Sequence, residues 1–175
     1  RDAQAAAGTL VKTGAGAAGF DYTKVCMNGA LNCAGAASNA AAPAAGEWAC
    51  TKDNRTNLIW SLQAGNDNWT NATSAANALV AANHFSNANA AGRCGYSTGW
   101  RLPTRRELLS IVHNGTSNPS IDIGNFPGTS AFFYWSSDTF VPNTAFAWYV
   151  FNDNLNSNLD VKTNSNSVRL VRSGQ

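Results

Sequence analysis

A run of asparagines interleaved with phenylalanines gives the segment from Asp138 to Ser167 the richest binding chemistry in this sequence. Asparagines spaced by two along an extended strand place their amides on one face, where each amide can donate and accept hydrogen bonds. Exposed phenylalanine beside such amides is typical of surfaces that bind sugars or proteins. The same asparagines could instead fill hairpin turns. The candidate ligand-binding residues of this segment are Phe140, Val141, Asn143, Phe146, Asn152, Asn154, Asn156, Asn158 and Asp160.

A second candidate binding group is the adjacent pair Arg105 and Arg106, which lies where a helix is predicted to begin. Because the two residues are neighbours, their side chains point to different faces of that helix. An exposed guanidinium is planar and binds a sulfate or a carboxylate through paired hydrogen bonds, so we include both arginines among the candidate ligand-binding residues. Arg101 and Glu107 are expected to form a structural ion pair that ties the helix to nearby loops.

The cysteines and histidines predict structural roles rather than catalysis. The four cysteines, Cys26, Cys33, Cys50 and Cys94, lack the close spacing of a zinc site. Two disulfides fit better, and Cys26–Cys33 with Cys50–Cys94 is the most natural of the three pairings. Disulfides indicate an extracytoplasmic protein, whereas the alternative is four buried thiols in a cytoplasmic one. His84 and His113 both fall at predicted helix ends, where the helix dipole favours a cation.

The composition predicts one weakly charged domain with a substantial core. Of the 175 residues 13% are charged and the formal net charge is +2, so no global field favours nucleic acid or a membrane surface. Six Trp, eight Phe and four Tyr supply large apolar groups. No apolar run is long enough to span a membrane, and no signal peptide is visible. Arg1 does not begin a natural open reading frame, which leaves room for an upstream signal or anchor.

Local patterns predict the elements that position these residues. Thr104 followed by Glu107 is a capping box, and the apolar residues after it predict a helix over 104–113. A narrow face of small residues predicts another helix over 70–84. A buried apolar run predicts a strand at 58–62. Four strand-like runs separated by polar turns predict further strands at 132–137, 145–151, 155–162 and 167–172. Two helices followed by an antiparallel sheet indicate an α+β fold that is loop-rich and disulfide-bonded.

The helix start carries a family resemblance. Trp100-Arg101-Leu102-Pro103-Thr104, with Glu107-Leu108, resembles the hallmark of the Lcl-type C-terminal domain, named for a collagen-like bacterial surface adhesin. More distantly, it resembles a segment of formylglycine-generating enzymes. Further blocks of the Lcl-type family appear in order: Cys50–Trp60, Cys94-Gly95-Tyr96, Phe126-Pro127, Tyr134–Ser137, Ala147–Val150 and Val168–Arg172.

The resemblance implies a C-type-lectin-like fold, with the two helices packed on the antiparallel sheet and the first and last strands side by side. We therefore expect a C-type-lectin-like domain over residues 20–175. Residues 1–19, which are rich in Ala and Gly, are expected to form a flexible arm or the stub of an upstream element.

The resemblance also bears on catalysis and on calcium. Formylglycine-generating enzymes act through redox-active cysteines or thiolate-bound copper near the C-terminal half, but no cysteine follows Cys94 here. Calcium-dependent C-type lectins carry Glu-Pro-Asn or a similar tripeptide, whereas Val141-Pro142-Asn143 lacks the leading oxygen ligand. We therefore expect no enzyme activity, no metal-binding residue and no cofactor, with calcium not favoured.

These observations predict an adhesin-like bacterial domain, extracellular or at the cell surface, that recognises a glycan or a host or bacterial surface protein through its Asn-rich C-terminal half. Two alternatives stay open. The chain could be a structural or tip subunit of a surface fibre such as a pilus, in which case it would assemble with further subunits or as a homo-oligomer. It could also be a diversified receptor of a diversity-generating retroelement, because such receptors share the C-type-lectin-like fold and vary near the C-terminus.

Overall fold

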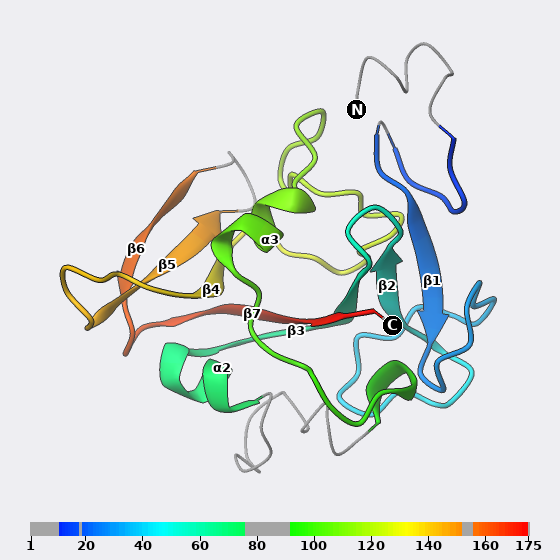
Figure 1. Ribbon diagram of the computed structural model, residues 1–175, viewed down its shortest axis with the longest axis horizontal. Coiled ribbons are helices and arrows are strands. Elements are labelled where there is room, and N and C mark those ends of the chain that lie inside the picture. Colours follow the sequence, from blue (N-terminus) through cyan, green and yellow to red (C-terminus); the bar gives the residue numbers. More distant parts are fainter. Residues whose placement is uncertain (1–10, 18, 76–91, 152–155, 175) are drawn as a thin grey trace.

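The computed structural model describes residues 11–17, 19–75, 92–151 and 156–174. Its seven strands form one sheet in the spatial order β1-β2-β3-β7-β4-β5-β6 (Figure 1). The strands are β1 (Tyr22–Cys26), β2 (Trp48–Asp53), β3 (Leu58–Asn68), β4 (Phe133–Thr139), β5 (Phe146–Phe151), β6 (Ser157–Val161) and β7 (Ser165–Ser173). The helical elements are α2 (Trp69–Ala75), the short 3₁₀ turn η1 (Arg93–Gly95) and α3 (Arg105–Ser110).

This architecture corrects the expected fold class. The α+β arrangement of two helices on an antiparallel sheet, in a C-type-lectin-like fold, is wrong, because the described residues form a mixed seven-stranded sheet with two short α-helices. The sheet is mixed because β4 and β7 run parallel, with Tyr134 opposite Ser167. The helix predicted over 104–113 spans only Arg105–Ser110. Of the helix predicted over 70–84, residues 76–84 lie outside the described part of the chain.

More of the chain is strand than its apolar patterns indicate. Each of the five predicted runs contains a strand, but β3 also continues through the polar stretch 63–68 because it pairs with the backbone of β7 there. β1 and β2 were not predicted, since residues such as Lys24 and Lys52 interrupt the apolar pattern. The first and last of the predicted strands do lie side by side, because β3 pairs with β7. The unpredicted strands β1 and β2 extend the sheet beyond β3, so the first strand of the structure is not next to the last.

β7 runs through the middle of the sheet and contributes to a core on each face. Val168 and Leu170 belong to one cluster of buried residues, which includes Trp100 and Trp135. Val171 belongs to a second cluster, which includes Leu108 of α3. Because successive strand residues point to opposite faces, the two clusters lie on opposite sides of the sheet. α3 covers the face that holds Val171, and Ala72 of α2 packs into the other core.

Arg169 is buried between β7 and the second core, with 1% of its surface exposed. Its guanidinium donates to the carbonyl of Ser61 at 2.9 Å and to the hydroxyl of Thr129 at 2.8 Å, and it lies 5.5 Å from the ring of Phe126. Burial lowers the pKa of Arg169 because the charged form loses its hydration, although Tyr134 partly opposes this effect. Neutral acceptors and ring faces therefore hold this cation.

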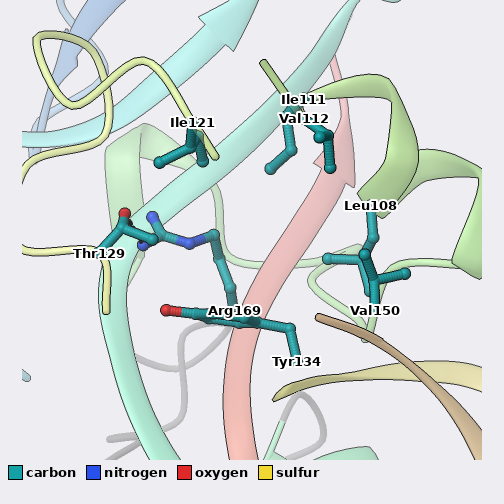
Figure 2. A pocket seen from close by; sticks show the side chains of 8 residues that line it. All are labelled: Leu108, Ile111, Val112, Ile121, Thr129, Tyr134, Val150 and Arg169. Carbon is teal, nitrogen blue, oxygen red and sulfur yellow. Dashed lines mark hydrogen bonds between the residues drawn. The ribbon is translucent and has the colours of Figure 1, made fainter. Parts of the chain in front are cut away.

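Figure 2 shows Arg169 pointing toward Thr129 at the wall of a small internal cavity, which is otherwise lined mainly by aliphatic side chains. Its volume of about 20 Å³ is enough for roughly one water molecule. The cavity is therefore a packing feature of the second core, too small for an organic ligand.

Both expected disulfides are formed, Cys26–Cys33 and Cys50–Cys94. The second joins β2 to η1 across 44 residues, and both of its cysteines are fully buried. Disulfides of this kind persist in oxidising compartments, which indicates a protein that functions outside the cytoplasm. Among the described residues, no helix is both long and apolar enough to cross a membrane.

We expect Arg169→Lys to lower the free energy of unfolding by about 2 kcal/mol, because an ammonium group cannot reach both Ser61 and Thr129 as the forked guanidinium does. Urea unfolding followed by tryptophan fluorescence measures the loss. Arg106→Lys is the matched control, since Arg106 is exposed and its replacement should change stability by less than about 0.5 kcal/mol. Equal losses in the two variants would contradict the structural role given to Arg169.

Candidate functional site

A capping box fixes the start of α3, as the sequence predicts. The hydroxyl of Thr104 accepts a hydrogen bond from the N–H of Glu107 at 3.2 Å, and the Glu107 carboxylate accepts one from the N–H of Thr104 at 2.7 Å. Both bonds satisfy backbone donors that the helix itself leaves unpaired. The first turn, which carries Arg105 and Arg106, therefore leaves the loop in a fixed direction.

Glu107 also forms the predicted ion pair with Arg101. Two guanidinium nitrogens donate to its two oxygens, at 2.8 and 2.6 Å. Burial acts to raise the pKa of Glu107, but the hydrogen bonds from Arg101 and Thr104 outweigh it, so the pKa lies below its usual range. The backbone of Arg101 exchanges two hydrogen bonds with Val171 of β7, both at 2.9 Å. One carboxylate therefore links α3 to the central strand of the sheet.

An open depression lies where the start of α3 meets β4 and β5, and we call it the Trp148 depression. Its volume is about 430 Å³, and its lining residues are Thr104, Arg105, Arg106, Asp138 and Trp148. The guanidinium carbon of Arg105 lies 4.3 Å from the ring centre of Trp148. The N–H of Arg105 donates to the Asp138 carboxylate at 2.6 Å, which holds the start of the helix against β4.

The Trp148 depression combines several kinds of contact in one place. The indole of Trp148 gives a flat apolar surface, and the ring of Phe140 meets it edge-on with centres 6.0 Å apart. Arg105 is stacked on the indole, so its guanidinium is held in position, while Arg106 is exposed beside it. Binding sites commonly join apolar or aromatic walls to a few placed polar groups in this way.

The structure brings together only some of the candidate residues. Arg105, Arg106 and Phe140 meet at the Trp148 depression. Val141 and Asn143 lie in the exposed loop between β4 and β5, where Val141 is 85% exposed and the Asn143 side chain accepts the N–H of Ala145 at 3.2 Å. Phe146 begins β5, two residues before Trp148, and therefore lies on the same face of the sheet.

Asn158 and Asp160 lie on the opposite face of the sheet from Trp148. They pair across the β5–β6 ladder with Tyr149 and Ala147, whose side chains alternate with that of Trp148. Asn156 is exposed just before β6, whereas Asn152 and Asn154 lie outside the described residues. The asparagines of β6 therefore do not extend the Trp148 depression.

Sequence reasoning missed three lining residues, Thr104, Asp138 and Trp148, as parts of a site. The sequence identifies Thr104 only as a helix cap and Asp138 only as the start of the Asn-rich segment, since neither pattern shows which element will pack nearby. Trp148 did carry a signal, because strand alternation sets it on the other face from Ala147, which is fully buried. Which face α3 would cover could not be read from that alternation.

The histidine that the structure describes has a structural role. His113 is 9% exposed, and its Nδ1 accepts the N–H of Gly115 at 2.9 Å. It lies three residues beyond the end of α3 rather than at the helix end where it was predicted. His84 lies outside the described residues.

A protein-family model described as the Lcl C-terminal domain matches residues 49–172, well over half of the chain. The matched range begins in β2, ends in β7 and contains every residue that lines the Trp148 depression. Among curated proteins, none matches the chain.

We expect Glu107 to contribute to the loss of stability in acid. Because its folded pKa is lowered, its contribution is fully present above the unfolded value of about 4.3 and is lost as the pH falls through the folded value. Glu107→Gln keeps a capping group but no charge, so its free energy of unfolding should fall less than that of the wild type between about pH 6 and pH 3.

Urea unfolding at a series of pH values measures this difference. Glu47→Gln is the control because it replaces the other glutamate of the chain, whose carboxylate accepts the backbone N–H of Ala44. Identical pH profiles for Glu107→Gln and the wild type would contradict the role given to the Arg101–Glu107 pair.

Proposed function

Because this chain belongs to the Lcl C-terminal domain family, we propose that it is a bacterial binding domain that works at the cell surface and recognises a glycan or a surface protein. We assign the binding to the Trp148 depression. The observation that carries the proposal is the stacking of Arg105 on Trp148 within an open depression, with Arg106 exposed at its side.

The chemistry of the Trp148 depression favours a ligand with an apolar face and an acidic group. The indole and Phe140 suit the apolar face of a sugar ring or a side chain. The two arginines outnumber the one lining carboxylate, Asp138, so the local charge is positive. A carboxylate or sulfate would pair with a guanidinium through two parallel hydrogen bonds. The exposed β4–β5 loop with Val141 and Asn143 would add contacts for a larger partner.

We propose that this domain is not an enzyme. All four cysteines are joined in disulfides, so none offers a free thiol as nucleophile. His113 is buried with Nδ1 occupied by Gly115, so it is poorly placed to act as a general base. Recognition through stacking and ion pairing requires neither group.

A glycan array and a panel of bacterial and host surface proteins, probed with the purified chain, test the proposed function. We expect Trp148→Ala to weaken binding about tenfold or more, because a central aromatic residue contributes a large share of binding energy. Arg106→Ala should weaken binding of an acidic ligand by a smaller factor, and that difference should shrink at high salt because the exposed charge is screened.

Lys24→Ala is the matched control for these variants. Lys24 Nζ lies 4.1 Å from the ring centre of Trp48, so the variant removes the cation from a similar stacked pair. That pair belongs to β1 and β2, at the other end of the strand order from β5. Equal losses in Trp148→Ala and Lys24→Ala, or no ligand anywhere in the panels, would contradict the proposal.

A further inference from the structure

The outer strand β6 carries a second feature, separate from the Trp148 depression. β6 ends the strand order and pairs with β5 alone among the described strands (Figure 1, left). Every second residue of such a strand directs its N–H and C=O away from the sheet, where they can pair with another chain.

The register shows which backbone groups of β6 point outward. The N–H of Lys162 donates to the carbonyl of Ala145 on the β5 side, at 2.9 Å. Because inward-directed residues alternate along an antiparallel ladder, residues 158 and 160 also direct their backbone groups to β5. The alternate residues Ser157, Leu159 and Val161 therefore direct their N–H groups away from the sheet.

Side chains of β6 itself already occupy the outward N–H groups of Leu159 and Val161. The N–H of Leu159 donates to Asn158 Oδ1, and the N–H of Val161 donates to Asp160 Oδ1, each at 2.8 Å. The outward carbonyl of Val161 accepts the N–H of Asn164 at 2.9 Å. The spacing by two of the polar side chains thus matches the spacing by two of the outward N–H groups.

The turn after β6 holds the second of these acceptors in place. The side-chain amide of Asn164 donates to Asp160 Oδ1 at 2.7 Å, and that of Asn166 donates to Asp160 Oδ2 at 2.9 Å. Asn166 is itself buried in β7, with 3% of its surface exposed. The Asp160 carboxylate is therefore anchored to the strand at the sheet centre.

We propose that Asn158 and Asp160 prevent β6 from pairing edge to edge with a second copy of this chain. An incoming strand would have to replace two hydrogen bonds that the edge already makes, one of them to an anchored carboxylate. Without these acceptors, the N–H groups of Leu159 and Val161 would be free donors at the edge of the sheet, next to two apolar side chains. Such an edge is a template for strand addition. The proposal is independent of ligand binding at the Trp148 depression.

Two measurements test the proposal. Asn158→Ala should speed hydrogen exchange of the Leu159 amide about fivefold or more while leaving the Val161 amide unchanged. The double variant Asn158→Ala with Asp160→Ala should sediment faster than the wild type as its concentration rises, because its edge can pair. Asn158→Asp keeps an acceptor oxygen at this position, so this single variant should match the wild type in both measurements.

Asn143→Ala is the matched control, because it also removes an exposed amide that accepts a backbone N–H, but in the β4–β5 loop. Far-UV circular dichroism verifies that each variant is folded. If loss of the Asn164 and Asn166 contacts unfolds the double variant, Asn158→Ala alone is compared with the control in both measurements. Self-association no greater than that of Asn143→Ala, or a Leu159 amide that exchanges as in the wild type, would overturn the proposal.

Discussion

The backbone pairing of β7 with both β3 and β4 is the interaction on which the rest of the structure depends. Among the described strands, β7 alone joins the β1–β3 group to the β4–β6 group. Its side chains alternate between two cores, and Arg169 holds β3 and the Thr129 loop to it. Hydrogen bonds join Val171 of β7 to Arg101, and Arg101 to Glu107, so β7 also fixes the position of α3. The Trp148 depression thus takes its geometry from a strand that does not line it.

In the described residues, aromatic rings hold more of the cations than carboxylates do. Two ion pairs are formed there, and the Arg55–Asp21 pair is long at 4.0 Å, whereas five Lys or Arg side chains lie over rings. This balance suits a chain that is rich in aromatic residues and poor in charge. Arg105 on Trp148 is one of the five pairs, so the candidate site uses the same interaction that stabilises the scaffold.

Local chemistry explains what could be predicted from the sequence. The capping box and the Arg101–Glu107 pair involve near neighbours in the sequence, and the predicted strands show as short strand-like runs, so these features could be predicted. Strand order was not, because it is set by backbone hydrogen bonds between segments as distant as Leu58 and Ser173. The spacing of Asn158 and Asp160 correctly placed them on one face. It could not show that this face lies opposite Trp148, since that depends on how β5 and β6 pair and where α3 packs.

The place of β7 has a consequence for how the protein matures. The sheet cannot be completed until β7 has emerged, because β3 pairs with β7 across about a hundred residues of sequence. Cys50 and Cys94, in contrast, both precede β4 and are available to each other earlier. For a chain that leaves a ribosome or an export channel N-terminus first, covalent closure of the first half can therefore precede completion of the sheet. The order of the sequence therefore allows the Cys50–Cys94 disulfide to form before the sheet is complete.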